Sequence, residues 1–184
     1  AYAVGDTERT VTADELLVTG PFKNDYERSK AESEVLVRSA GPRVSTLIFR
    51  PSMIVGDSLT GRTSAFNVIY IPARLIAAGL FSIFPGSPQT PCDLVPVNYV
   101  ADAMCELSKR PFVSGTSYHL CSGVSRESCI REIIDQLVQV VNSYSRRGLS
   151  LLHVPPIIPL ETIGKMITSI AHLSHKSHLR GLEE

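Results

Sequence analysis

The chain has 184 residues, of which 43% are hydrophobic and 20% charged, and its 18 basic and 18 acidic residues give a formal net charge of zero. This composition is ordinary for a globular domain, and the charge balance gives no electrostatic case for a nucleic-acid partner. No run of 18 apolar residues occurs, so we expect no membrane span and a cytoplasmic location. The four cysteines include no C-x-x-C pair, and we expect no metal site.

The first predicted element is a helix over residues 26–40 that begins near Asp25. Asn24 can act as its N-cap, and Glu27 can reach back to the N–H of the cap and complete a capping box. The pair Gly41-Pro42 is typical of a helix end. These signals predict both ends of the helix from local sequence alone.

Residues 44–49 form a short, largely apolar run rich in β-branched residues, which predicts a parallel strand buried on both faces. The segment Arg50–Asp57 follows and leads into a loop. Ligands of open α/β sheets bind at the carboxyl ends of the strands, so this loop lies where binding is expected.

The rest of the chain continues the alternation of helix and strand. We predict helices over residues 65–80, 99–109 (capped by Asn98), 125–142 and 160–173, and strands over 93–97 and 115–121. This order predicts an α/β fold: the C-terminal portion of a Rossmann-like parallel sheet, followed by a mostly helical substrate lobe. The glycine-rich G-x-G-x-x-G turn of dinucleotide-binding sheets does not occur in the sequence.

The predicted domain boundary lies at residue 123. Residues 1–123 would be the later part of a nucleotide-binding domain, and residues 124–184 a helical segment of the substrate lobe. The first residues, Ala1–Asp6, resemble the end of an apolar strand followed by a turn. We therefore expect the chain to be one part of a longer protein.

Tyr26 and Lys30 place a phenol and an ammonium at positions i and i+4, on one face of the predicted helix. A free tyrosine has a pKa of about 10, and a neighbouring cation is expected to lower it. Tyr26 could then act as a general acid toward a carbonyl group. By itself the spacing fits an ordinary surface pair equally well.

Three ordered stretches give the spacing its context: residues 24–34, 49–58 and 93–103. Together they closely resemble the extended short-chain dehydrogenase/reductases, and most of all their thioester reductase and fatty acyl-CoA reductase branch, also called male sterility proteins. The run Arg50–Gly61 and the pair Phe66-Asn67 resemble characteristic segments of that branch. The resemblance covers the C-terminal part of the family's domain and ends near Gly123.

The resemblance implies a role for several residues. Tyr26 would be the catalytic acid and base, and Lys30 would lower its pKa and hydrogen-bond the nicotinamide ribose. Pro51, Ser52, Met53 and Ile54 would line the nicotinamide end of the cofactor, largely through backbone. The cofactor would be NADP, with NAD as the alternative. The family's catalytic Ser/Thr precedes an A-Y-x-x-G segment and its phosphate loop lies further upstream, so a complementary N-terminal segment is an expected partner.

The implied reaction is reduction of a carbonyl, most plausibly an acyl thioester on a carrier protein or coenzyme A, to an aldehyde or alcohol. Two alternatives stay open: an epimerase, dehydratase or hydroxysteroid dehydrogenase on the same scaffold, and a non-catalytic remnant or partner-binding module. Other candidate sites have simpler explanations. The series His172, His175 and His178 diverges around a helix, and the arginine pair at 146–147 suits a solvated helix end.

Overall fold

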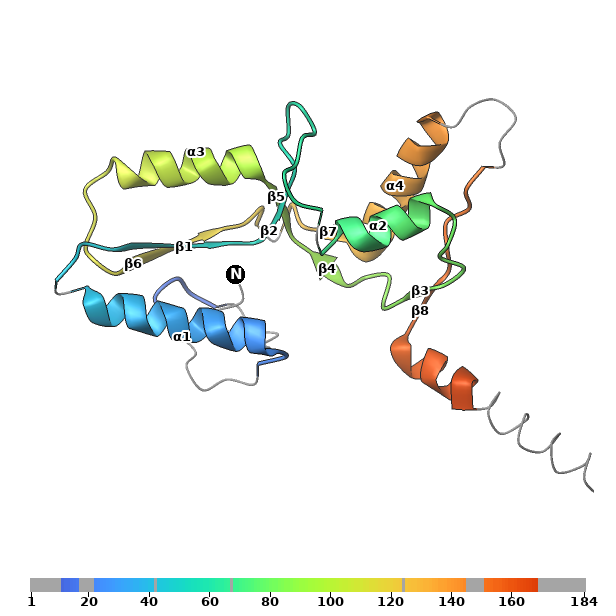
Figure 1. Cartoon of the computed structure of the whole chain (residues 1–184), viewed down its shortest axis with the longest axis horizontal. Helices are drawn as coiled ribbons and strands as arrows, with labels where there is room; N and C mark the ends of the chain where they lie inside the picture. The colour runs from blue at the N-terminus through green and yellow to red at the C-terminus, as the bar shows by residue number, and fades with distance from the viewer. Residues whose placement is uncertain are drawn as a thin grey trace, which may run out of the picture. The chain divides into compact units, whose positions relative to one another are not determined.

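The computed structural model describes residues 11–16, 22–41, 43–66, 68–123, 125–144 and 151–168. It divides the chain into two compact units (Figure 1). Unit one comprises Ala1–Ser64 and Asp93–Glu127, and unit two comprises Ala65–Cys92 and Ser128–Glu184. The boundary predicted at residue 123 is a different kind of division, between a cofactor-binding part and a substrate-binding part. It stays a prediction.

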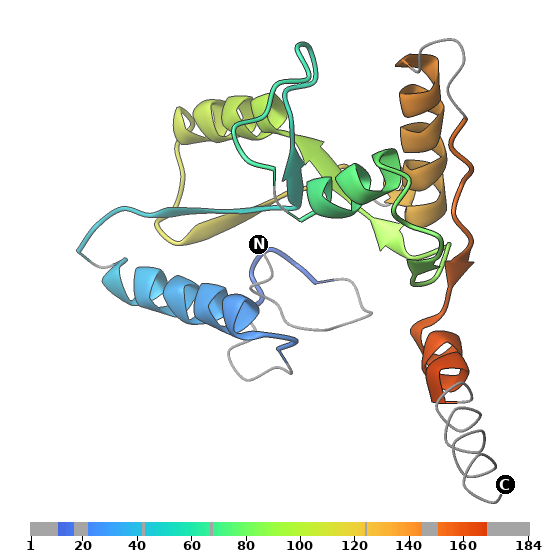
Figure 2. The same ribbon diagram turned by 45° about the vertical axis from the view of Figure 1, so that its right-hand side comes forward.

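Unit one holds parallel strands between two helices. Its elements are α1 (Asp25–Ala40), β1 (Leu47–Pro51), β2 (Met53–Val55), β5 (Leu94–Pro96), α3 (Val97–Ser108) and β6 (Thr116–Leu120). Strand β1 pairs in parallel with β6, and β2 pairs in parallel with β5. Figures 1 and 2 show α1 and α3 on opposite faces of the β1–β6 pair. The predicted α/β class with parallel strands is confirmed.

Helix α1 begins where its local sequence predicts. The side chain of Asn24 accepts a hydrogen bond from the Glu27 N–H at 2.9 Å, as expected of an N-cap. The Glu27 carboxylate in turn accepts from the N–H of Lys23 at 2.9 Å, one residue before the position expected for a capping box. At the other end, the N–H of Gly41 donates to the Arg38 carbonyl.

The strand predicted over residues 44–49 is displaced, since β1 spans Leu47–Pro51, and the segment Arg50–Asp57, expected to lead into a loop, contains a second strand, β2. Between the two strands, the Ser52 N–H donates to the Leu120 carbonyl at 2.9 Å, and the Ser52 hydroxyl donates to the Asp93 carbonyl at 2.7 Å. These bonds reach β6 and the start of β5, far away in the sequence. Pairing with distant strands therefore decides these bounds.

The core of unit one lies between α3 and the strands. Val95, Val100 and Leu120 are buried there, with partly buried neighbours Phe49, Ala103, Leu107 and Tyr118. The predicted capping role of Asn98 is wrong, because α3 already begins at Val97 and its N-cap is Pro96. Asn98 instead accepts a hydrogen bond from the Ser58 N–H and donates one to the Ser58 hydroxyl, both at 2.9 Å.

Unit two is built around a pair of helices (Figure 2). Its elements are α2 (Tyr70–Ala77), β3 (Phe84–Pro85), β4 (Pro91–Cys92), β7 (Ser128–Cys129), α4 (Ile130–Tyr144) and β8 (Ile157–Ile158). Strand β3 pairs in parallel with β8, and β4 pairs antiparallel with β7. Ile76 of α2 and Ile134 and Val138 of α4 form the buried core.

Helix α2 is shorter than the predicted 65–80. Pro72 lies in its first turn, where its missing N–H costs nothing. Gly79 ends it: with a φ of 68° it occupies the left-handed region, and its N–H donates to Ile76 while that of Leu80 donates to Leu75, at 2.9 Å each.

Helix α4 begins at Ile130, because Ser128 and Cys129 pair with β4 instead of opening the predicted helix. Residues 160–168 are helical. The rest of the predicted 160–173 helix, the three histidines at 172–178 and the arginine pair at 146–147 lie outside the described residues. Over the ranges that the structure describes, every helix is too short or too polar to cross a membrane.

Candidate functional site

Tyr26 and Lys30 lie one turn apart near the start of α1. The Lys30 ammonium lies over the Tyr26 ring, with Nζ 5.5 Å from the ring centroid. Both side chains are exposed, Tyr26 by 58% of its surface. The structure thus brings the pair together as the i, i+4 spacing predicts, and it leaves both groups accessible to a ligand. Their catalytic roles stay predictions at this point.

The pair is accessible because α1 buries a different face. Its buried residues are Glu27, Ala31 and Glu34, which recur at the 3.6-residue period of a helix. Tyr26 precedes the first of these residues and Lys30 precedes the second, which places both away from the sheet side. The helix therefore docks through one face and presents the phenol and the ammonium on another.

The segment Pro51–Ile54 runs from the carboxyl end of β1 into β2. Pro51, Ser52 and Met53 are half-buried, whereas Ile54 exposes 43% of its surface. The Ser52 hydroxyl is used inside the fold, as a donor to the Asp93 carbonyl. Ser52 therefore supports the segment through its side chain, and Ile54 supplies its exposed apolar surface.

Asp93 holds this segment from the other side, a role that sequence reasoning missed. Its carbonyl accepts from the Ser52 hydroxyl and, at 3.3 Å, from the Met53 N–H. Its carboxylate accepts from the Ser122 N–H at 3.0 Å and from the Ser122 hydroxyl. Ser122 lies 29 residues away in the chain. No local pattern could have indicated that Asp93 links the ends of three strands.

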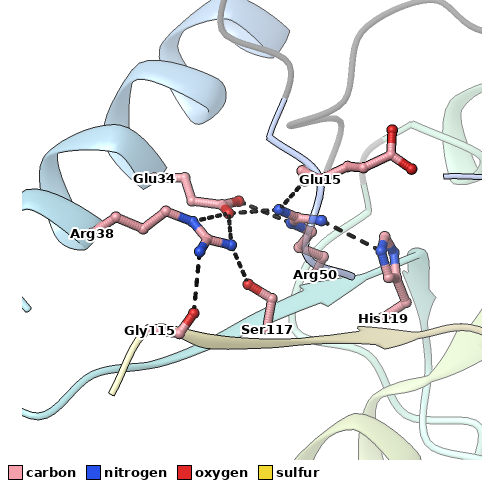
Figure 3. Close-up of polar contacts among 7 residues, drawn as sticks. All are labelled: Glu15, Glu34, Arg38, Arg50, Gly115, Ser117 and His119. Carbon is pink, nitrogen blue, oxygen red and sulfur yellow. Dashed lines mark hydrogen bonds and ion pairs between the residues drawn. The ribbon is translucent and has the colours of Figure 1, made fainter. Parts of the chain in front are cut away.

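A buried ion pair connects α1 to β1 (Figure 3). The Arg50 guanidinium donates from Nε to Glu34 Oε2 at 2.9 Å and from Nη2 to Oε1 at 2.6 Å. The two side chains expose only 2% and 6% of their surfaces. Arg38 also donates to Glu34 Oε1, at 3.0 Å, and from its other nitrogens to the Gly115 carbonyl and the Ser117 hydroxyl of the β6 region.

Burial opposes ionisation of the Glu34 carboxyl, but hydrogen bonds from Arg50 and Arg38, together with their positive charges, outweigh burial and lower the pKa of Glu34. A carboxyl with a lowered folded-state pKa stabilises the fold above its unfolded value of 4.5, and this contribution disappears as pH falls through the folded value. The pair therefore contributes fully at neutral pH.

Glu34→Gln should be less stable than the wild type at pH 7. The difference should shrink below about pH 4.5, because Glu34 then binds a proton in the unfolded wild type, and it should vanish below the lowered folded-state pKa, where Glu34 is neutral in both states. Urea unfolding at several pH values measures this difference. Glu32→Gln, an exposed residue on the same helix, is the matched control and should follow the wild type at every pH. A Glu34→Gln deficit that is independent of pH would contradict the assignment.

The loop after β2 is held by Asp57. Its Oδ1 accepts from the Thr60 N–H at 2.8 Å, the Thr60 hydroxyl at 2.9 Å and the Leu59 N–H at 3.0 Å. The hydrogen bonds from Thr60, and then that from Leu59, lower the pKa of Asp57. Asp57 thus closes the turn at the start of this loop. Leu59 is left 88% exposed at the tip of the loop.

These residues fit one end of a nicotinamide dinucleotide. Tyr26 and Lys30 offer an accessible phenol and ammonium, which are able to hydrogen-bond the hydroxyls of a ribose, and Ile54 offers exposed apolar surface just beyond the carboxyl end of β1. The sequence contains no glycine-rich turn for the pyrophosphate. The fit therefore extends to the nicotinamide end alone.

Comparison with known sequences identifies the family of the first part of the chain. Residues 1–104 match the NAD-binding family model described as "Male sterility protein". The chain is 28% identical over 104 residues to the nonribosomal peptide synthetase asaC of Aspergillus flavus, and 32% identical over 101 residues to the non-canonical nonribosomal peptide synthetase cpsA of Aspergillus campestris. Each match covers 54% of this chain and about a tenth of the relative, 10% and 9% respectively.

Solved structures agree on the fold. The terminal R domain of the myxalamid PKS-NRPS biosynthetic pathway superposes with a TM-score of 0.64 at 24% identity, over 93% of this chain and 41% of that one. RMD from Pseudomonas aeruginosa, solved in complex with NADPH, has a TM-score of 0.57 at 24% identity, over 86% and 51%. The chain spans about half or less of both. The chain belongs to the male sterility protein family of NAD-binding domains.

Proposed function

We propose that this chain supplies the catalytic helix of an NADPH-dependent reductase whose substrate is an acyl thioester on a carrier protein or coenzyme A. The observation that carries the proposal is the accessible Tyr26–Lys30 pair, with the ammonium 5.5 Å from the ring centroid. The family match over residues 1–104 supports a nicotinamide cofactor. The relatives are named nonribosomal peptide synthetases, and one fold neighbour is the terminal R domain of a PKS-NRPS pathway, which supports a thioester substrate.

In the proposed reaction, a nicotinamide held by Lys30 and the Pro51–Ile54 segment would supply a hydride to the thioester carbonyl carbon. The Tyr26 hydroxyl donates its proton to the carbonyl oxygen as negative charge develops there. Lys30 holds the ribose and stabilises the phenolate that remains on Tyr26. The hydroxyl group formed on the substrate would then return its proton to Tyr26 as the carbon–sulfur bond breaks, which releases the thiolate, protonated by water, and an aldehyde. A second molecule of NADPH would be needed for the same steps to convert the aldehyde to an alcohol.

The segment Pro51–Ile54 would line the nicotinamide end of the site. Its backbone is fixed by hydrogen bonds to Asp93 and Leu120, so it needs little rearrangement on binding. NADP is the proposed cofactor, with NAD as the alternative. The loop that Asp57 stabilises would shape the substrate side, with Leu59 presented to the acyl group or its carrier.

A complementary segment would complete the site, since the sequence holds no pyrophosphate-binding turn. We propose that such a segment and the thioester carrier are the partners of this chain, in the cytoplasm and without nucleic acid. Nucleotide-sugar epimerases share the fold at 12% and 14% identity. That degree of likeness favours no particular substrate for this chain, and neither does it favour a non-catalytic role.

A substrate panel tests the proposal. The protein in its full natural length is incubated with NADPH and one of four compounds: octanoyl-pantetheine, octanoyl-CoA, a UDP-sugar or a ketosteroid. Conversion of each compound is followed by chromatography as well as by the loss of NADPH absorbance, because epimerisation of a sugar consumes no NADPH. We expect turnover with the two thioesters and none with the sugar or steroid. Turnover with the sugar or steroid alone would assign the chain to another branch, and no turnover with any of them would favour the non-catalytic alternative.

A further inference from the structure

The buried Glu34–Arg50 pair is the most constrained polar contact between α1 and the strands. Arg50 also donates from Nη2 to the Glu15 carbonyl at 2.8 Å, and its Nη1 lies 3.3 Å from His119 Nε2 on β6 (Figure 3). All three guanidinium nitrogens thus have partners, from three separate parts of unit one. When a carboxylate binds a planar guanidinium at two points, both the distance and the relative rotation of the two groups are fixed, and so are those of the helix and the strand that carry them.

Burying two charges is expensive, and apolar side chains of the same size often stabilise a protein as well or better. A buried pair is therefore weak evidence for stability, and stronger evidence for a need to fix one geometry. Helix α1 has few other contacts that could fix its position against the strands. Over the ranges that the structure describes, neither apolar core cluster includes a residue of α1, and two of the three residues that α1 buries are glutamates.

Each member of the pair also adjoins, along the chain, one of the two groups of proposed site residues. Glu34 is one turn beyond Lys30 on α1, and Arg50 immediately precedes Pro51. Tyr26 lies eight residues before Glu34, which is about 12 Å along the helix axis. A tilt of about 5° at Glu34 would therefore move Tyr26 by about 1 Å. A displacement of about 1 Å at a reacting group can slow a reaction on the order of 100-fold.

We infer that the Glu34–Arg50 pair positions the Tyr26–Lys30 turn of α1 against the Pro51–Ile54 segment, so that Glu34 and Arg50 are positioning residues of the site. Arg38 adds hydrogen bonds to the Gly115 carbonyl and to the Ser117 hydroxyl, and these bonds attach α1 to a second strand, β6. The catalytic consequence rests on the proposed reductase function, whereas the placement of α1 does not depend on it.

The experiment compares Glu34→Gln with Glu32→Gln, which removes an exposed carboxylate from the same helix. Hydrogen exchange of the α1 amides is measured first, without substrate. We expect faster exchange in α1 for Glu34→Gln, with unchanged exchange in α3 and β6, and wild-type behaviour for Glu32→Gln. Unchanged α1 exchange in Glu34→Gln would overturn the inference. Glu34→Asp, which keeps the charge, gives the same comparison if the glutamine variant does not fold.

The second readout is kinetic, with octanoyl-pantetheine and NADPH deuterated at the transferred position. Glu34→Gln should lower kcat by 10-fold to 100-fold with KM changed less than about 2-fold, and the deuterium isotope effect on kcat should rise, because a misplaced Tyr26 makes the chemical step slower. Glu34→Asp should recover part of kcat. A smaller folded fraction would leave the isotope effect unchanged, and that result would overturn the positioning role.

The two readouts separate the inference from the function on which it rests. If the wild type reduces no thioester, the proposed function fails. The hydrogen exchange of α1 then still tests whether the Glu34–Arg50 pair holds this helix in place. If the wild type is active and Glu34→Gln matches Glu32→Gln in both readouts, the function stands and the positioning inference fails.

Discussion

Replacing Tyr26 with phenylalanine should lower turnover at least about 100-fold, because removal of a general acid typically costs between 10²-fold and 10⁴-fold. The affinity for NADPH should change little. The Tyr26 ring keeps its place on the first turn of α1, and the Lys30 ammonium can still lie over its face. Steady-state assays with octanoyl-pantetheine measure the first quantity, and fluorescence titration with NADPH measures the second.

Tyr144→Phe is the control for this variant. Tyr144 ends α4, is 85% exposed and has no place in the proposed site, so its loss should leave turnover at the wild-type value. Unchanged turnover in Tyr26→Phe would show that another group protonates the oxygen. A parallel loss of NADPH affinity would instead show that Tyr26 binds the cofactor without acting on the substrate.

Replacing Arg50 with methionine should lower the free energy of unfolding by about 3 kcal/mol, because it leaves the Glu34 carboxylate buried without its main partner. Chemical denaturation measures the loss. Arg28→Met is the matched control. Arg28 pairs with Asp25 on the exposed surface of the same helix, so its removal should cost no more than about 0.5 kcal/mol.

A double variant makes this second prediction specific. Arg50→Met combined with Glu34→Gln leaves no uncompensated charge in the interior, so it should be more stable than Arg50→Met alone. Additive losses in the double variant would contradict the ion-pair account. A loss below about 1 kcal/mol in the single variant would mean that water reaches the pair.

Elements whose ends are set by neighbouring residues were predicted well. The start of α1 depends on Asn24 and Glu27, which are three residues apart, and its end on Gly41. The i, i+4 spacing of Tyr26 and Lys30 is equally local, so their contact followed from the helix itself. No distant residue had to be known for either prediction.

The errors share a different cause. Strand β2 forms because Met53–Val55 pair with β5, which lies about forty residues further along the chain. Asn98 does not cap α3, and its side-chain amide is hydrogen-bonded to Ser58 instead. The contacts of Arg50 with Glu34 and His119 span 16 and 69 residues. Such pairings depend on the tertiary fold, and neither propensity nor periodicity encodes which distant partner is chosen.

The most direct measurement of the central claim follows the transferred hydrogen. The protein in its full natural length is incubated with octanoyl-pantetheine and NADPH carrying deuterium at the transferred position of the nicotinamide, and the products are analysed by mass spectrometry. The account predicts octanal with one deuterium at the aldehyde carbon, or octanol with two. Octanoate, unlabelled aldehyde or unchanged thioester would contradict it.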